Sequence, residues 1–400
     1  MTNRPAEKPS KLCSGCSACV QICPSEALGL EPDEDGFLRI RTDLSRCCHC
    51  NLCEQVCPFS NPIESSDGSF DVSFVYAAKH HCAQVRSQSS SGGVFTALSD
   101  AVLSKNGVVF GAVYDSQWNV RHAAAFNSQQ RDKQRGSKYV QSIMGAAFTE
   151  VESLLKDGKT VLFTGTPCQN AGLKLYLKAK QTDTSNLYLC DLVCHGVESP
   201  RLLQDHIAFL EKKFNSPVAR YEFRASGQEH SRVTFQNGVV IENTEESGYA
   251  LELFFQNKIL SATCLQCPFA TQKRCSDITI GDFWGIEKSL PDFADWGNVS
   301  LILVNSPQGK RLLEQSCAAL NLWESNWKDC LQPSLEAPTP TPDDYLQFKK
   351  TYREKGFLYI LHYYFHYGFY YNIKFRIIRR FYKIFGKQIK QIKRLFYREK

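Results

Sequence analysis

A run of four cysteines followed by a proline occurs twice near the start of this 400-residue chain, and it limits the fold of that region strongly. Both copies have the spacing C-x2-C-x2-C-x3-C-P, with the cysteines at positions 13, 16, 19 and 23 and at positions 47, 50, 53 and 57. Three thiolates in one tight turn fit three corners of a cubane, while the fourth points toward a second cubane. Zinc sites instead combine two pairs of ligands. The repeat therefore predicts two [4Fe–4S] clusters.

The exchange of the fourth cysteine between the two runs fixes the expected ligand sets. One set is Cys13, Cys16, Cys19 and Cys57, and the other is Cys47, Cys50, Cys53 and Cys23. Residues 12–60 are accordingly predicted to form an α+β ferredoxin-like 2[4Fe–4S] module. Cys48 is an additional cysteine that we interpret as a passive neighbour.

The chain contains 18 cysteines, a number that suggests a secreted disulfide-rich protein. That class is not favoured here, because residues 1–12 are polar and lack the apolar stretch of a signal peptide. Eight of the cysteines are also assigned to clusters, which must be kept reduced. We therefore expect a cytoplasmic protein, and its length allows two or three domains.

Residues 72–332 alternate apolar strand-like runs with helical patterns. Strands are expected at 74–78, 108–113, 160–164, 187–193, 278–281 and 300–304, and helices at 94–104, 143–155, 171–177, 201–214 and 309–319. Such alternation predicts an α/β domain with a substantially parallel sheet. Ligands of these sheets bind beyond the carboxyl ends of the strands.

Three of the expected strands are followed by segments that contain thiol, imidazole or carboxylate side chains. The strand at 160–164 is followed by Gly165-Thr166-Pro167-Cys168-Gln169, and the strand at 187–193 by Cys194-His195-Gly196. The strand at 278–281 is followed by Asp282-Phe283-Trp284-Gly285. Neighbouring parallel strands bring their carboxyl ends to one edge, so these loops are expected to converge. His195 and Asp282 are candidate catalytic proton donors, although His195 can equally be a structural, hydrogen-bonded residue.

A further group of cysteines comprises Cys264, Cys267 and Cys275, with Pro268 after the second. Three thiolates are too few for a closed site, and Cys168 or Cys194 can supply a fourth. A third [4Fe–4S] cluster is the preferred interpretation, because it would extend an electron-carrying chain from the ferredoxin module. A zinc knuckle is the alternative.

Two loops suit a phosphate-bearing cofactor. Ser89-Ser90-Ser91-Gly92-Gly93 precedes an expected helix, where small residues and bare amides can bind a pyrophosphate. Taken alone, such a loop is also typical of an ordinary helix cap. Gly136-Ser137-Lys138-Tyr139 adds a cation that can face a phosphate or a reduced flavin, although a single lysine is usually a surface residue.

These motifs together resemble the coenzyme F420 hydrogenase/dehydrogenase beta-subunit family, in the bacterial form with an N-terminal ferredoxin module. The resemblance covers about residues 12–332. It implies an FAD-binding α/β domain with a cluster beside the flavin. The implied cofactor-binding residues are Ser90, Ser91, Gly92, Gly93, Ser137, Lys138, Tyr139 and Thr166, and the implied metal ligands include Cys168, Cys194, Cys264, Cys267 and Cys275.

The resemblance predicts an iron–sulfur flavoprotein oxidoreductase. It would pass electrons between a ferredoxin-type protein, three [4Fe–4S] clusters, FAD and an unidentified small molecule that accepts or donates hydride. Bacterial relatives are linked to surface polysaccharide synthesis. One alternative is an electron-transfer subunit of a larger complex without a substrate site. Another is a scaffold that binds nucleic acid or membrane and uses its clusters structurally.

The last part of the chain, residues 343–400, has a different character. From residue 349 onward there are fifteen basic and two acidic residues, whereas the rest carries 32 basic and 39 acidic residues. Apolar residues recur at helical spacing, at Ile377, Phe381, Ile384, Phe385, Ile392 and Phe396. This pattern predicts a basic amphipathic helix on an anionic membrane face, and thus a peripheral membrane location. Docking on the chain itself or on a partner protein is the alternative, and nucleic-acid binding is least favoured.

Overall fold

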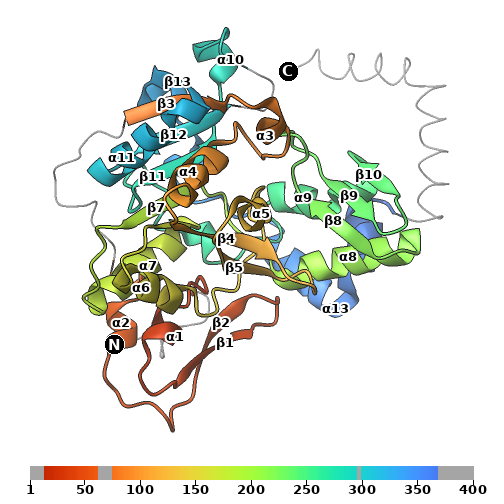
Figure 1. The fold of residues 1–400 in the computed structure, drawn as a ribbon. Helices are drawn as coiled ribbons and strands as arrows, with labels where there is room; N and C mark the ends of the chain where they lie inside the picture. Colours follow the sequence, from red (N-terminus) through yellow and green to blue (C-terminus); the bar gives the residue numbers. More distant parts are fainter. Residues whose placement is uncertain (1–12, 62–73, 295–298, 368–400) are drawn as a thin grey trace, which may run out of the picture. The chain divides into compact units, whose positions relative to one another are not determined.

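The computed structural model describes residues 13–61, 74–294 and 299–367. By its internal contacts the chain divides into a large unit, Met1–Tyr345, and a smaller one, Leu346–Lys400. The large unit contains the N-terminal cysteine-rich module, an eight-stranded sheet and a smaller three-stranded sheet (Figure 1).

The N-terminal module repeats its backbone as well as its sequence. Helices α1 (Ala18–Ile22) and α2 (Leu52–Gln55) each follow a tight turn, and strands β1 (Leu28–Pro32) and β2 (Leu38–Thr42) form an antiparallel hairpin. Gly15 and Ser17 in the first cysteine run, and His49 and Asn51 in the second, all have positive φ. The left-handed residues thus occupy equivalent positions in both runs, which gives the two turns the same shape.

The large sheet has the strand order β13-β3-β12-β11-β7-β6-β4-β5. Its strands are β3 (Phe74–His80), β4 (Val108–Tyr114), β5 (Val120–Ala125), β6 (Val161–Thr164), β7 (Leu187–Leu192), β11 (Ile278–Asp282), β12 (Ser300–Val304) and β13 (Leu320–Ser325). Only the central strands β4, β6, β7 and β11 pair in parallel, and the outer strands pair antiparallel. The domain is therefore a mixed α/β domain with a parallel centre, and each strand expected from the sequence is present.

Helices cover both faces of this sheet, and the alternation of side chains along the strands separates two cores. Phe110 and Phe163 face one core, with α6 (Ala147–Lys156) and α7 (Pro167–Ala179). Val109 and Leu162 face the other, with α4 (Val94–Leu103) and α11 (Pro307–Ser316). Helix α1 of the N-terminal module joins the first core through Ala18 and Ile22 and contacts α7.

The three-stranded antiparallel sheet consists of β8 (Val218–Glu222), β9 (Arg232–Phe235) and β10 (Val240–Glu242). Helices α8 (Pro200–Phe214) and α9 (Glu245–Phe255) contact each other, and α8 contacts β8. Short helices α3 (Ala83–Ser87), α5 (Ser128–Asp132), α10 (Ile286–Ser289) and α12 (Trp327–Cys330) connect the larger elements.

Helix α13 (Tyr345–Tyr364) forms most of the described part of the smaller unit and is interrupted at Gly356, where φ is 76°. Across the residues that the structure describes, none of the helices combines the length and apolar character needed to cross a bilayer. The basic amphipathic helix expected beyond residue 376 lies outside the described residues.

Candidate redox site

The thiols of the N-terminal module group as the cysteine spacing predicts. Burial raises the pKa of Cys19, and the nearby thiols of Cys16, Cys13, Cys57 and Cys53 raise it further. Burial also raises the pKa of Cys53, together with the thiols of Cys50, Cys23 and Cys47. Each group thus includes the last cysteine of the other run. Four thiols around a common centre are the donor set that a [4Fe–4S] cluster requires.

Four thiols of the α/β domain form a third group. Burial raises the pKa of Cys194, and the thiols of Cys264, Cys168 and Cys267 act on it in that order. Burial also raises the pKa of Cys264 to about 12, with contributions from Cys168 and Cys267. Cys168 and Cys194 follow β6 and β7, which are parallel neighbours, so the expected convergence of these two loops is observed. Both candidate fourth ligands therefore belong to the group.

Cys275, the remaining cysteine of the predicted set, contacts Pro167 and lies near Arg274 and Asp191. Its Sγ lies 3.6 Å from the carbonyl oxygen of Pro167. Burial raises its pKa, followed by the charge of Asp191, while Arg274 lowers it. Arg274 and Asp191 form a buried ion pair at 2.9 Å. These contacts favour a place for Cys275 beside the ion pair, and they do not test its prediction as a ligand.

None of these groups has the geometry of a site for a single ion. In residues 13–61, 74–294 and 299–367, no three or more His, Cys, Asp or Glu side chains converge closely enough to hold one metal ion. The ferredoxin-type cysteines do not converge in this way either, because the thiolates of a cubane are distributed around four irons. The chemistry of each donor set, four thiols, fits an iron–sulfur cluster.

The first thiol group of the module lies beside the α/β thiols. Burial raises the pKa of Cys16 most, and among the neighbouring thiols Cys168 raises it most. A Cβ on Gly172 in α7 would lie only 3.1 Å from the Sγ of Cys16. The absence of a side chain at Gly172 thus allows the module to approach the helix that begins next to Cys168.

Buried polar contacts fix this approach. The side chain of Gln141 accepts a hydrogen bond from the Leu38 amide at 2.7 Å and donates to the carbonyl oxygens of Ser14 and Leu38. On the other side, the Arg39 guanidinium donates to Ser261 Oγ at 2.9 Å and to the Cys13 carbonyl oxygen. The module is therefore joined to the α/β domain next to its first cysteine run.

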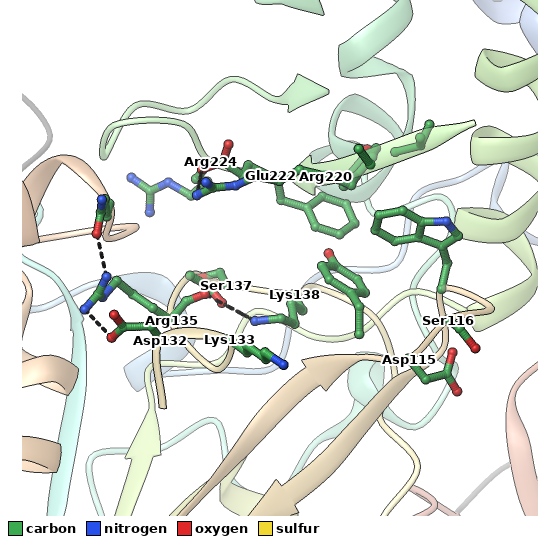
Figure 2. Close-up of a pocket in the computed structure, with 18 of the residues that line it drawn as sticks. Asp115, Ser116, Asp132, Lys133, Arg135, Ser137, Lys138, Arg220, Glu222 and Arg224 are labelled. Carbon is green, nitrogen blue, oxygen red and sulfur yellow. Dashed lines mark hydrogen bonds and ion pairs between the residues drawn. The ribbon is translucent and has the colours of Figure 1, made fainter. Parts of the chain in front are cut away.

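A large cavity of about 820 Å³ opens between the loop after α5, the β4–β5 turn and strand β8. Figure 2 shows Arg135, Ser137 and Lys138 on one wall, with Arg220, Glu222 and Arg224 on the opposite wall. Tyr114 and Trp118 also line it, with ring centroids 5.3 Å apart. The volume and the aromatic surface suit a cofactor-sized organic ligand.

Lys138 is the cation most suited to an anionic ligand in this cavity. Its Nζ donates to the carbonyl oxygens of Gln134, Arg135 and Gly136 at 3.1–3.3 Å, and none of its described contacts is a carboxylate. Burial lowers its pKa to about 7. Arg135, in contrast, already binds Asp132. A fixed ammonium without a counter-ion fits a phosphate or an anionic ring.

The Ser-Gly loop at residues 89–93 is built differently from an open phosphate cradle. The Gly92 amide donates to Ser300 Oγ at 2.8 Å, and a Cβ at Gly92 would lie 2.3 Å from the Ala78 carbonyl oxygen. Ser91 donates to the Val299 carbonyl oxygen. Gly92 is thus explained by packing against β3 and β12, which corrects the expectation of a bare amide there.

Of the remaining residues of these two loops, Ser137 and Lys138 line the cavity, whereas Ser90, Gly93 and Tyr139 do not. The Ser137 amide donates to Ser90 Oγ at 2.8 Å, which joins the Ser-Gly loop to the cavity wall formed by Ser137 and Lys138. Gly93, with φ of 88°, precedes the first residue of α4. Tyr139 packs between Phe223 and Phe254, at ring distances of 5.5 and 4.6 Å.

The two candidate proton donors are both engaged elsewhere. His195 Nε2 lies 2.7 Å from Asn257 Oδ1, and burial lowers the pKa of its imidazole. Asp282 forms an ion pair with Arg224, which lines the cavity. Thr166 has a structural role in the capping box that begins α7. Neither His195 nor Asp282 itself lines the cavity.

Comparison with known families now identifies the chain. Residues 12–61 match the model of the 4Fe-4S dicluster domain. Residues 158–329 match the model of the C-terminal part of the beta subunit of coenzyme F420 hydrogenase/dehydrogenase. The chain belongs to this beta-subunit family. It is an iron–sulfur electron-transfer protein, and membership of this family supports an oxidoreductase role for it.

This chain is also similar to a chain of known structure. A chain of the F420-reducing [NiFe] hydrogenase complex from Methanosarcina barkeri is similar, with 18% sequence identity and a TM-score of 0.45. The similarity covers 74% of this chain and 92% of that chain. No curated protein matches the sequence.

Several cavity residues were not recognised in the sequence. Strand β8 and the two residues after it supply Arg220, Glu222 and Arg224 to the cavity, whereas Tyr221 and Phe223 between them are buried. This alternation of charged and aromatic residues has the period of a half-buried strand, so the sequence could have indicated a strand with one charged face here. The neighbouring Tyr114 and Trp118 carry no motif, and only the fold brings them to β8.

Proposed function

We propose that the chain is an iron–sulfur flavoprotein oxidoreductase with three [4Fe–4S] clusters and one FAD. The observation that carries this proposal is the continuity of the three thiol groups. Cys50 of the second module run is exposed, Cys16 of the first run is buried, and Cys16 in turn is influenced by Cys168 of the α/β domain. Electrons would enter at the exposed group and move inward.

The four thiols at Cys168, Cys194, Cys264 and Cys267 are the proposed ligands of the third cluster. A zinc ion is the alternative occupant of the same thiols. Their position next to Cys16 supports the cluster, because a redox-inactive ion would end the relay at the module.

FAD is the proposed ligand of the cavity beside the Lys138 loop. When bound, a flavin couples one-electron carriers to two-electron hydride chemistry. The Lys138 ammonium would neutralise a negative charge of the cofactor, and Ser137 would offer a hydroxyl. Tyr114 and Trp118 would supply aromatic surface. A hydride-accepting or hydride-donating small molecule completes the reaction.

A pair of cysteine variants tests the relay. In Cys16→Ala, reduction of the bound FAD by a reduced ferredoxin should fall at least tenfold, whereas dithionite should still reduce it. Cys317→Ala is the control, because Cys317 is exposed and its Sγ contacts only the Glu314 carbonyl oxygen among the contacts described for it. Equal rates in both variants would show that electrons bypass the module.

A second candidate function is that of an electron-transfer subunit without a substrate site of its own. The matched family model, which describes a beta subunit, favours it. Activity of the isolated chain with an artificial donor and a small acceptor separates the two functions. Comparison of metabolites between a deletion strain and its parent tests the proposed link to surface polysaccharide synthesis.

The proposed membrane contact depends on the basic segment beyond the described residues. Full-length protein should sediment with anionic vesicles and be released by high salt. A chain truncated after Pro342 should remain in the supernatant and keep its iron and FAD. Equal vesicle binding by both proteins would refute a membrane anchor in this segment.

A further inference from the structure

The hydroxyl group of Thr166 contacts one of the proposed ligands of the third cluster. Thr166 Oγ1 lies 3.2 Å from the Sγ of Cys168. A thiolate that binds iron has no hydrogen to give, so the hydroxyl is the donor of this bond when a cluster is present. In the N-terminal module, Ser25 Oγ lies at a longer distance, 3.6 Å, from the Sγ of Cys23. The third thiol group therefore receives the shorter of these two hydroxyl contacts.

Thr166 is held in place by the start of helix α7. It is the N-cap residue of this 13-residue helix and forms a capping box with Gln169. The Thr166 amide donates to Gln169 Oε1 at 2.9 Å. Cys168 is the second residue of the helix, and the helix dipole favours negative charge in this first turn. The hydroxyl and the helix therefore both favour negative charge on the Cys168 sulfur.

A buried network holds Gln169 in turn. Its Nε2 donates to Ser142 Oγ at 2.8 Å, and this hydroxyl lies 3.0 Å from His122 Nδ1. His122 Nε2 lies 3.0 Å from the Thr164 carbonyl oxygen. A carbonyl oxygen can only accept, so Nε2 carries the hydrogen and Nδ1 accepts from Ser142. The network thus begins at Gln169 and returns to the backbone two residues before Thr166.

The loop that carries Thr166 has little room for another shape. A Cβ on Gly165 would lie 3.0 Å from Gln169 Oε1 and 3.2 Å from the Phe163 ring. The His122 ring stacks on the Phe163 ring, with centroids 5.4 Å apart. Gln169 and His122 are both buried. The position of the Thr166 hydroxyl is therefore determined by packed and hydrogen-bonded neighbours.

We propose that the Thr166 hydroxyl donates a hydrogen bond to the Cys168 sulfur of the third cluster and thereby raises the reduction potential of that cluster. This inference rests on the proposed function, which assigns Cys168 as a ligand. Reduction adds one negative charge, which strengthens a hydrogen bond to a ligand sulfur, so the bond stabilises the reduced state. The step transfers one electron from the ferredoxin module. The O–H bond of Thr166 stays intact, and no proton or leaving group moves.

Redox titration of the native protein and of Thr166 variants, followed by EPR, tests this bond. Thr166→Val keeps the shape of the side chain but lacks the hydroxyl, so its third cluster should be harder to reduce. The reduction equilibrium should change by about tenfold, as for one hydrogen bond to a charged group, and this corresponds to about 59 mV for one electron. Thr166→Ser retains a hydroxyl and should restore the native potential.

Two further variants make the measurement specific. Cys194→Ser should lack the third cluster, so the EPR signal that it loses belongs to that cluster. Thr149→Val is the control, because Thr149 is exposed in the first turn of α6 and its hydroxyl donates to the Ala146 carbonyl oxygen at 2.8 Å. This variant should keep the native potential. A shift equal to that of Thr166→Val would overturn the inference.

The iron content separates a failure of this inference from a failure of the proposed function. The native protein and Thr166→Val should both contain about twelve iron per chain. With that content, a native potential in Thr166→Val overturns the inference alone. A native protein with about eight iron and without the third EPR signal overturns the third cluster, and this inference with it.

Thr166→Ala is the second variant, needed if Thr166→Val does not keep its iron. It also lacks the hydroxyl, but it places less bulk at the start of α7. With about twelve iron it should show the same lowered potential. Loss of about four iron from both variants, with full content in Thr166→Ser, would show that the hydroxyl is needed to assemble the cluster. That result would overturn its assignment to the reduction potential.

Discussion

Cys194 and Cys275 lie in the same domain, yet their surroundings assign them different roles. Cys194 is grouped with three other thiols, whereas Cys275 faces the Arg274–Asp191 ion pair. Cys194→Ser should therefore lower the iron content by about four atoms per chain, the size of one cubane. Cys275→Ser should keep the full content. Iron analysis after anaerobic purification checks both variants, and iron loss from Cys275→Ser would contradict the grouping.

Lys138 has an unusual protonation equilibrium that predicts a pH-dependent affinity. Because burial lowers its pKa to about 7, the ammonium of the cofactor-free protein loses its proton as pH rises through neutrality. The affinity for FAD should therefore be weaker at about pH 8.5 than at pH 6, and Lys138→Met should lose most of this dependence. Titration of FAD fluorescence measures it. The exposed Lys159→Gln serves as a control and should retain the native dependence.

Gly92 is predicted to matter for stability before it matters for any ligand. Gly92→Ala places a methyl group against the backbone of Ala78 and Ser300, which cannot move easily. The free energy of unfolding should fall by about 1–3 kcal/mol. Gly248→Ala in α9 meets nothing within 4 Å and should be neutral or stabilising by up to about 1 kcal/mol. Denaturant unfolding of the two variants compares them. Equal stability would return Gly92 to the list of possible cofactor contacts.

The parallel centre of the large sheet was predictable because each of its strands is recognisable from its local amino-acid composition. Val161–Thr164 and Leu187–Leu192 are short apolar runs, and a cysteine comes shortly after each: Cys168 in the first turn of α7 and Cys194 in a loop. Their convergence follows from the rule for parallel strands, and the structure confirms it for Cys168 and Cys194. A contiguous motif after a regular strand was therefore sufficient to predict that these two cysteines lie close together.

The cavity was less predictable because its residues come from elements distant in sequence. Strand β8 approaches the Lys138 loop only through the long connection that includes α8. Local patterns identify what a residue can do chemically, but they do not show which partners tertiary packing removes or supplies.

Gln141 is one of the buried side chains that connect the N-terminal module to the α/β domain. Gln141→Leu would leave the Leu38 amide and the Ser14 carbonyl without their partner. The free energy of unfolding should fall by at least about 2 kcal/mol, since each abandoned buried group costs about 1–3 kcal/mol. Gln204→Leu, which loses one exposed hydrogen bond to Asn119, should stay within about 0.5 kcal/mol of the native chain. A similar small change for both variants would show that Gln141 does not hold the module.

The chain combines a two-cluster module, a third thiol group and a cavity whose Lys138 has no carboxylate among its described contacts. Cys16 and Gly172 are in close contact, so the first and third thiol groups are adjacent.

Anaerobically purified native protein should contain about twelve iron and twelve sulfide per chain, together with close to one FAD released by acid. This composition follows from three four-thiol groups and one cofactor-sized cavity. A content of about eight iron with one zinc would contradict the third cluster. The absence of any flavin would contradict the proposed oxidoreductase itself.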